Sequence, residues 1–298
     1  MRAPFVLCCL VLFACGGGGH DATARAPASD IDDFGSPVHV GTPSDPARIV
    51  SLNPTTTDLL FAIGAGPRIV GRTEWDAWSD SVRAIPNLGP GLGPNVEAVL
   101  ASRPDLVVLY ASADNAAAAR QLRSAGVRVI ALKVDRLADF RRAAFLLGDA
   151  TGESARASAV VDSVTATLER VRAATDGLRR PKVFWHIWDS PIITIGKGSY
   201  MNDLVEIAGA QNVYGDVASS SPTVSLEDVI RRNPDEIIAG PIGAARIRAS
   251  ALWQTVAAVR RDDIIVVDTM LVGRPGARLG EAAVSLAKLL HPGIEGLP

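Results

Sequence analysis

Residues able to do acid–base, nucleophilic or metal chemistry are few in this chain, and they are far apart. Its four histidines are His20, His39, His186 and His291, and only His186 lies well inside the body of the sequence. All three cysteines fall within the first fifteen residues, which excludes thiolate zinc ligands from the rest of the chain. One interior histidine is too few for a zinc or manganese site, so we expect no metal site and no cofactor.

Sequence motifs of common enzymes are not found either. The chain has no Gly-x-Ser-x-Gly elbow, and the run Gly196–Ser199 lacks the spacing of a phosphate-binding loop. Asp76 and Asp189 could act as a general acid and a general base, but nothing in the sequence sets the distance between them. We therefore expect no catalytic residues.

The aromatic residues indicate a ligand instead. Only 5% of the residues are aromatic, yet several lie at or just past the ends of expected strands. Aromatic walls with a few polar groups suit a large, flat or apolar ligand, and an arginine can meet its carboxylate, phosphate or amide groups. Any one of these residues could merely cover a core edge, but their grouping favours a site. The candidate ligand-binding residues are Trp75, Asp76, Tyr110, Trp188, Met270 and Arg274.

Composition sets the class of protein. The chain has 298 residues, 48% of them hydrophobic and 21% charged, with a net charge of −2. These values exclude a disordered chain and one whose overall field would attract nucleic acid. The length suits two domains of ordinary size, and we expect a monomer.

The first residues look like an export signal. The apolar run from Phe5 to Ala14 is too short for a membrane-spanning helix, which needs roughly 20 residues, but it fits a signal-peptide core. The run ends in Leu-Phe-Ala-Cys, which resembles a bacterial lipobox. We therefore expect Cys15 to be lipidated and to anchor the protein to a membrane, in the periplasm or at the cell surface. An ordinary secretory signal is the alternative.

The candidate site residues must be positioned by alternating strands and helices. Short apolar runs such as Asp105–Tyr110 indicate strands buried on both faces, typical of a parallel sheet. The segment from Glu153 to Asp176 has no Gly or Pro and predicts one long helix. The pattern predicts two Rossmann-like α/β lobes joined by a single long rigid helix, with a ligand cleft between the lobes. The expected segments are a signal peptide (1–14), a flexible tether (15–46), an N-terminal lobe (47–152), a linking helix (153–178) and a C-terminal lobe (179–298).

Two pairs of segments also resemble each other. Asn95–Asp105 matches Ser225–Asp235, with a capping residue, a Glu two residues later and Pro-Asp before a strand. Leu59–Gly64 matches Leu204–Gly209, with a helix that ends at glycine. Two matches in the same order favour duplication of one lobe, although helix-Pro-Asp-strand is also a common local solution.

One glutamate in each repeat is a candidate for partner binding. Glu97 and Glu227 occupy equivalent positions in the first turn of a helix. A carboxylate there offsets the helix dipole, which alone could account for both residues. As a pair with one member in each lobe, they could also form a two-point acidic grip for a basic partner.

At this point the sequence resembles a known family. Arg48–Gly66 and Asn95–Val108 resemble the N-terminal lobe of periplasmic binding proteins of cobalamin and iron-chelate ABC importers. Trp188–Gly196, Ser199–Leu204 and Arg274–Arg278 resemble their C-terminal lobe, so the likeness covers about residues 47–291. It implies a ligand held between two lobes, little hinge closure and no catalysis.

The resemblance also implies roles and partners. Glu97 and Glu227 match glutamates that dock to arginines of the membrane permease, and Tyr110 matches an aromatic position of the cobalamin cleft. Gly91 and Ser221 stand where the cobalamin-binding protein has tryptophan. We expect a substrate-binding lipoprotein that carries cobalamin or a related corrinoid. A ferric siderophore or haem is the first alternative, and a chelatase or hydrolase on the same scaffold, or a surface binder without a transporter, are the others.

Overall fold

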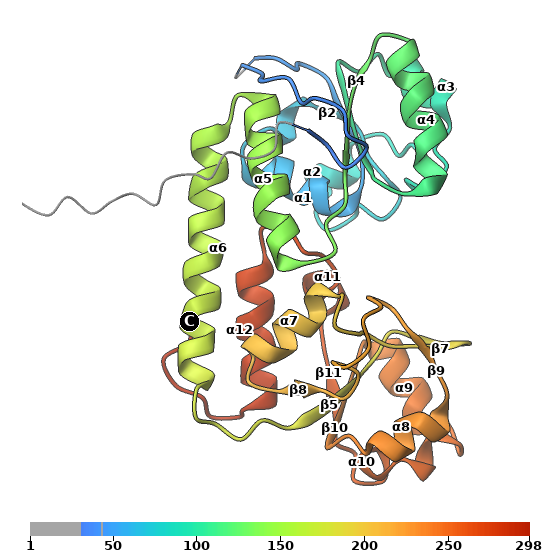
Figure 1. Ribbon diagram of the computed structural model, residues 1–298, viewed down its shortest axis with the longest axis vertical. Helices are drawn as coiled ribbons and strands as arrows, with labels where there is room; N and C mark the ends of the chain where they lie inside the picture. The colour runs from blue at the N-terminus through green and yellow to red at the C-terminus, as the bar shows by residue number, and fades with distance from the viewer. Residues whose placement is uncertain (1–30, 43) are drawn as a thin grey trace, which may run out of the picture.

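The computed structural model describes residues 31–42 and 44–298 and contains two α/β lobes joined by the long helix α6 (Figure 1). The N-terminal lobe comprises β1 Ile49–Leu52, α1 Pro54–Ala62, η1 Gly66–Arg68, β2 Ile69–Gly71, α2 Asp80–Arg83, α3 Val96–Ala101, β3 Leu106–Tyr110, α4 Ala113–Ser124, β4 Arg128–Leu132 and α5 Leu137–Thr151. Helix α6 is Ser154–Thr175. The C-terminal lobe comprises β5 Lys182–His186, β6 Trp188–Asp189, β7 Ile192–Ile193, α7 Tyr200–Ile207, β8 Gln211–Asn212, β9 Thr223–Val224, α8 Leu226–Arg232, β10 Glu236–Ala239, α9 Pro241–Ala249, η2 Trp253–Thr255, α10 Ala257–Arg260, β11 Ile264–Val266, α11 Thr269–Val272 and α12 Leu279–Leu290.

Each lobe is built on a four-stranded parallel sheet, as the apolar strand runs predicted. The order is β2-β1-β3-β4 in the N-terminal lobe and β8-β5-β10-β11 in the C-terminal lobe. In both lobes the first strand along the chain pairs with the second and the third, so the two orders are equivalent. The predicted α/β class with two lobes is confirmed.

The sequence repeat has the same geometry in both lobes. Asp105 Oδ2 accepts a hydrogen bond of 2.9 Å from the backbone N of Arg48, at the start of the first strand of its lobe. Asp235 Oδ2 accepts one of 2.9 Å from the backbone N of Lys182, at the equivalent place. The residue before each Pro-Asp pair is left-handed, with φ 49° at Arg103 and 48° at Asn233. The Pro-Asp motif therefore ties a helix end to the first strand in each lobe.

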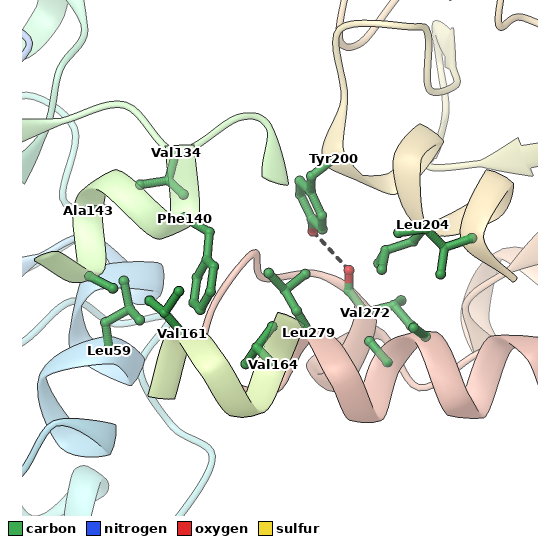
Figure 2. Close-up of a cluster of buried hydrophobic side chains, with 14 of the residues drawn as sticks. Leu59, Val134, Phe140, Ala143, Val161, Val164, Tyr200, Leu204, Val272 and Leu279 are labelled. Carbon is green, nitrogen blue, oxygen red and sulfur yellow. Dashed lines mark hydrogen bonds between the residues drawn. The ribbon is translucent and has the colours of Figure 1, made fainter. Parts of the chain in front are cut away.

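The lobes share one continuous apolar core (Figure 2). Leu59 of the N-terminal lobe, Val161 of α6 and Leu279 of the C-terminal lobe belong to the same buried cluster. Helix α12 packs along α6, where Gly280 lets the helices approach, since a Cβ there would lie 2.9 Å from the Cβ of Thr167. Helix α6 is the covalent link between the lobes, and α12 packs beside it and makes the connection stiffer.

The structure corrects two expectations from the sequence. The apolar run 183–188 predicts a first strand of the C-terminal lobe that reaches Trp188, but this strand ends at His186. Trp188 instead begins the antiparallel strand β6, which pairs with β7. Residues 31–42 and 44–46 are not a free tether either. Asp32 is 3% exposed, and its Oδ2 accepts a hydrogen bond of 2.9 Å from the backbone N of Ala131 in the edge strand β4. This segment therefore packs on the N-terminal lobe.

The signal peptide and Cys15 lie outside the described residues, so export and lipidation remain predictions from the sequence. Within the part of the chain that the structure describes, no helix has the length and apolar character needed to cross a membrane.

Candidate functional site

Large apolar side chains are exposed on the segments that follow the parallel strands. Trp75 follows β2 and is 60% exposed, Trp188 follows β5 and is 57% exposed, and Met270 follows β11 and is 44% exposed. Ligands of open α/β sheets bind beyond the carboxyl ends of the strands. An exposed tryptophan or methionine costs solvation free energy, so these residues at strand ends are the candidate ligand-binding surface.

Two further exposed apolar residues join this group, and the sequence analysis missed both. Leu92 is 51% exposed in the glycine-rich loop 89–93, and Ile242 is 71% exposed at the start of α9, just after β10. The segment 240–249 after β10 contains no aromatic residue, so the aromatic pattern that marked the other strand ends did not single out Ile242. Leu92 stands next to Gly91, so the loop could have been recognised as a wall of the site.

Arg274 links the lobes instead of standing free. Its Nη2 donates a hydrogen bond of 2.6 Å to the carbonyl oxygen of Trp75 in the other lobe. Its Cζ lies 4.8 Å from the ring centroid of Trp78, a cation–π contact. Two more inter-lobe hydrogen bonds lie nearby, from Ala277 N to Asp58 Oδ2 at 2.7 Å and from Tyr200 N to the carbonyl of Asp135 at 2.7 Å.

Asp76 does not reach the surface, so its predicted contact with a ligand is withdrawn. It has no exposed area, and its Oδ2 accepts hydrogen bonds from the backbone N and the hydroxyl of Thr73 at 2.9 and 2.7 Å. Burial raises the pKa of this carboxyl although Thr73 and Arg274 act in the opposite direction. Asp76 therefore closes the turn that presents Trp75.

Tyr110 is half-buried at the end of β3. Its hydroxyl donates a hydrogen bond of 2.9 Å to Asp135 Oδ1. Burial, together with this carboxylate, raises the pKa of the phenol, so it stays neutral at physiological pH. Only the ring of Tyr110 is therefore available to line a ligand site.

His186 is buried at the end of β5 and is already engaged. Its Nε2 lies 2.9 Å from Asp189 Oδ1, and Arg246 Nη1 donates a hydrogen bond of 2.9 Å to Asp189 Oδ2. Burial lowers the pKa of His186 despite the neighbouring carboxylate. Asp189 is paired on both oxygens and Asp76 is buried in the other lobe, so they do not form an acid–base pair.

Metal binding would need a cluster of ligating side chains. Among the described residues, no group of three or more His, Cys, Asp or Glu side chains could hold a metal ion.

A polar pocket of about 360 Å³ lies between the lobes. The sequence predicted a ligand cleft there, but it did not predict the charged residues that line this pocket. Its lining residues are Lys133, Asp135, Arg136, Asp139, Gly198, Ala218 and Ser220. Lys133, Asp135 and Arg136 come from the loop after β4, and Asp139 comes from the first turn of α5. Asp135 also accepts the hydrogen bond of the Tyr110 hydroxyl.

The candidate docking glutamates lie apart from this site. Glu97 and Glu227 are exposed in the first turns of α3 and α8, which lie one in each lobe on the side of the molecule away from α6 (Figure 1). The side chains of Asn95 and Ser225 cap these helices by accepting from the backbone N three residues later. Within residues 31–42 and 44–298, neither glutamate forms an ion pair.

Known proteins resemble this chain along most of its length. A family model described as periplasmic binding protein matches residues 49–270. An uncharacterised ABC transporter substrate-binding lipoprotein of Bacillus subtilis is 27% identical over 304 residues, which cover 97% of this chain and 96% of that protein. A cobalamin-binding protein of Halobacterium salinarum is 27% identical over 265 residues, covering 83% of this chain and 70% of that one.

The fold agrees with the sequence comparisons. The solved structure of a periplasmic haem-binding protein from Pseudomonas aeruginosa superposes with a TM-score of 0.76 at 23% identity, covering 85% of this chain and 95% of that one. The bilobed architecture and the family model agree. The chain belongs to the periplasmic binding protein family, whose members bind ligands and are not enzymes.

Proposed function

We propose that this protein is the substrate-binding lipoprotein of an ABC importer and that it captures cobalamin or a related corrinoid. The observation that carries the proposal is the group of exposed aromatic and aliphatic side chains at the strand ends, with Arg274 beside them. A corrin is a large ring with apolar faces and an amide-bearing rim, and this group offers matching surfaces. The relatives named as a cobalamin-binding protein and a transporter lipoprotein support it.

Haem is the alternative, and it is favoured by the structural likeness to a haem-binding protein. Haem iron needs an axial ligand, commonly histidine or tyrosine. The three tyrosines and the interior histidine are all occupied or buried. Tyr200 donates to the carbonyl of Val272 at 2.8 Å, Tyr214 is 1% exposed, and Tyr110 and His186 are bound as described above. Met270, which is 44% exposed, is the side chain of the candidate site that could still bind haem iron. A chelate whose metal is already fully coordinated needs no such ligand.

A titration of the mature chain tests the ligand. We would follow tryptophan fluorescence while adding cyanocobalamin, a panel of ferric siderophores, or haemin, and record the haemin absorption spectrum in parallel. We expect saturable quenching by cyanocobalamin, because Trp75 and Trp188 are exposed. No response to cyanocobalamin together with saturation by a siderophore would reject the corrinoid, and a ligated Soret band would favour haem.

A pair of matched variants separates the site from nonspecific quenching. Ile242 and Leu252 are both 71% exposed, but only Ile242 follows a strand end of the parallel sheet. We expect Ile242→Ala to weaken cyanocobalamin binding and Leu252→Ala to leave it unchanged. Equal effects of the two substitutions would place the ligand elsewhere.

Delivery is the second half of the proposal. Glu97 and Glu227 offer one exposed carboxylate in each lobe on the same side of the molecule. Carboxylates presented this way suit arginines on the surface of the membrane permease, and charge complementarity would also set the orientation of docking. The predicted lipid at Cys15 would keep the protein close to that membrane.

A further inference from the structure

The helices that carry the docking glutamates are too short to be stable alone. Helix α3 has six residues and α8 has seven, and each fully buries a single side chain, Val99 and Val229 respectively. Helices of this length depend on tertiary contacts, because so few hydrogen bonds do not offset the cost of nucleation. The direction in which Glu97 and Glu227 point must therefore be set by residues outside the first turn.

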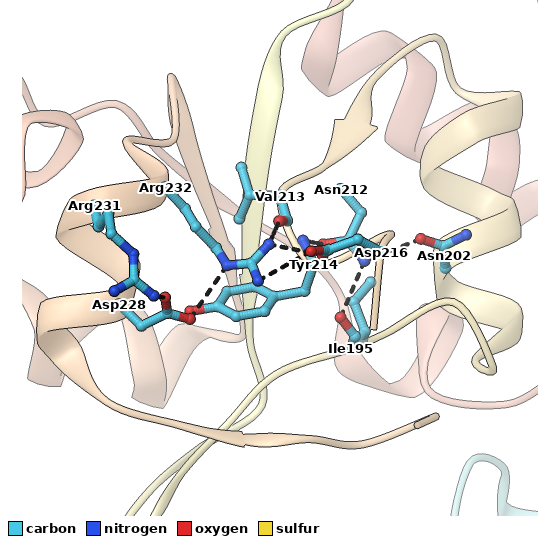
Figure 3. Close-up of polar contacts among 9 residues, drawn as sticks. All are labelled: Ile195, Asn202, Asn212, Val213, Tyr214, Asp216, Asp228, Arg231 and Arg232. Carbon is cyan, nitrogen blue, oxygen red and sulfur yellow. Dashed lines mark hydrogen bonds and ion pairs between the residues drawn. The ribbon is translucent and has the colours of Figure 1, made fainter. Parts of the chain in front are cut away.

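In the C-terminal lobe, Arg232 supplies such contacts (Figure 3). Its Nη1 donates to the carbonyl of Val213, and the guanidinium binds both carboxylate oxygens of Asp216 at 2.7 and 3.2 Å. The guanidinium carbon lies 4.2 Å from the ring centroid of Tyr214, which is buried against Phe184 of the central strand β5. The last residue of α8 is thereby fixed to the core of the lobe.

The same guanidinium also holds the residue next to the docking glutamate. Arg232 Nε donates a hydrogen bond of 3.2 Å to Asp228 Oδ2. Burial alone would raise the pKa of Asp228, but the Tyr214 hydroxyl and the Arg232 guanidinium outweigh it and lower that pKa. Asp228 therefore stays ionised and bound, and the turn that contains Glu227 is held at both ends.

In the N-terminal lobe, a different arginine braces the equivalent helix. Ser102 occupies the position that corresponds to Arg232 and cannot make these contacts. Instead, Arg48 at the start of the lobe donates from Nη2 to the carbonyl of Ser102 at 2.7 Å and from Nε to the carbonyl of Arg103 at 3.0 Å. These are the free carbonyls at the C-terminal end of α3, where a cation is also favoured by the helix dipole.

We infer that Arg48 and Arg232 are positioning residues for permease docking, each fixing the helix that presents the glutamate of its lobe. The inference rests on the proposed docking role of Glu97 and Glu227. In each lobe an arginine fixes the helix that carries the glutamate, but the two arginines come from different positions of the repeat. Guanidinium geometry is essential at both places, because each arginine bridges several acceptors that one ammonium group cannot span.

Hydrogen–deuterium exchange on the mature chain tests the bracing itself. We expect Arg232→Gln to increase exchange at the backbone amides of residues 226–233 and to leave the other lobe unchanged. Arg231→Gln is the matched control, because Arg231 also pairs with Asp228 but its side chain is 78% exposed. For α3 the pair is Arg48→Gln against Arg120→Gln, an exposed arginine on α4. If neither Arg232→Gln nor Arg48→Gln changed the exchange of its helix, the inference would be overturned.

Binding to membranes tests the role in docking. The probe is fluorescently labelled, lipid-free protein added to spheroplasts of cells that lack their own copy. We expect Arg232→Gln to weaken saturable binding about fivefold to tenfold and Arg232→Lys to rescue little of it, with cyanocobalamin affinity unchanged. In a Glu227→Gln background the same substitution should change binding less than about twofold, because its effect passes through Glu227.

The possible results separate the inference from the proposed function. If the double variant with Glu97→Gln and Glu227→Gln binds membranes as well as the wild-type protein does, the docking proposal fails. The positioning role of the arginines then fails as well. If the glutamates matter but Arg232→Gln weakens binding equally with or without Glu227, the positioning role is wrong while docking stands. A loss of cyanocobalamin affinity in Arg232→Gln would show a general structural defect and would also overturn the positioning role.

Discussion

The guanidinium of Arg274 crosses from the C-terminal lobe to donate a 2.6 Å hydrogen bond to the carbonyl of Trp75 in the N-terminal lobe. The backbone of one exposed aromatic residue is thus fixed by the arginine expected to meet the ligand. The contact with the Trp78 ring adds a second hold on the same loop. One side chain therefore joins the lobes and fixes the loop that carries Trp75 and Trp78.

Replacement of Arg274 should therefore affect both stability and affinity. We expect Arg274→Ala to lower the free energy of unfolding by about 1–2 kcal/mol, since a hydrogen bond and a cation–π contact are lost. Cyanocobalamin affinity should fall about tenfold, and Arg274→Lys should recover only part of it because an ammonium group cannot stack and donate in the same geometry. Urea unfolding and fluorescence titration measure the two effects. An unchanged affinity in the alanine variant would remove Arg274 from the site.

Asp76 predicts a pH dependence of stability. Burial raises its pKa above the ordinary 3.8, so its contribution is most favourable below pH 3.8 and is lost as the pH rises through the raised value. Its Oδ1 makes no hydrogen bond within the described part of the chain. We expect Asp76→Asn to become progressively more stable relative to wild type between pH 4 and pH 7. Urea unfolding at pH 4 and at pH 7 measures the stability difference between the variant and the wild type. If the advantage of the variant shrank as the pH rose, the raised pKa of Asp76 would be contradicted.

Much of the fold could be read from local sequence. The capping residues, the glycines that end helices and the Pro-Asp motif act through neighbouring backbone atoms, so their effect is visible in short windows. The matched segments Asn95–Asp105 and Ser225–Asp235 favoured duplication of one lobe. The equivalent strand orders agree with this, and each Asp binds the start of the first strand in its lobe. The long helix was visible from the lack of Gly and Pro between Glu153 and Asp176.

The site was harder to predict because its features depend on distant parts of the chain. Neither the burial of Asp76 under the turn at Thr73 nor the reach of Arg274 to the other lobe leaves a local signal. Trp188 was placed at a strand end, but β6 turns it onto an antiparallel ribbon whose partner strands are too short to show periodicity. Ile242 was revealed only by its exposure, which needs the folded structure, whereas the position of Leu92 beside Gly91 was visible in the sequence.

Reversal of the two docking charges should abolish transport without affecting capture. We expect Glu97→Arg combined with Glu227→Arg to eliminate cyanocobalamin uptake by cells, because the permease would then face like charges. Ligand affinity in solution should stay within about twofold of wild type, since both residues lie away from the strand ends. Each single charge reversal should reduce cyanocobalamin uptake only in part. Normal uptake by the double variant would show that delivery does not use these carboxylates.

The shared core predicts little movement between the lobes. Leu59, Val161 and Leu279 belong to one cluster, and closing the lobes would have to shear this packed region. We expect spin labels at Arg120 on α4 and Ala245 on α9 to report an inter-lobe distance that changes by less than about 2 Å when cyanocobalamin binds. Pulsed electron resonance measures that distance. A larger shortening would indicate a hinge that the continuous core does not suggest.

Asp32 explains why residues 31–42 and 44–46 do not behave as a tether. The carboxylate accepts four hydrogen bonds, from the backbone N of Phe34, Ser36 and Ala131 and from Arg123 Nη2 at 2.7 Å. The next residue continues the contact, because Asp33 N donates to the carbonyl of Ala131 at 2.9 Å. The segment thereby covers the outer edge of β4, which would otherwise present unpaired backbone groups.

Removal of this carboxylate should be costly for the N-terminal lobe. We expect Asp32→Ala to lower the free energy of unfolding by about 2–4 kcal/mol, because a buried backbone N–H and a partly buried guanidinium lose their acceptor. Asp33→Ala is the matched control, since Asp33 is more exposed, and it should cost less. Urea unfolding measures both, and protease cleavage within residues 31–46 should rise in the Asp32 variant alone. Equal stability of the two variants would mean that backbone pairing along β4, rather than Asp32, holds the segment in place.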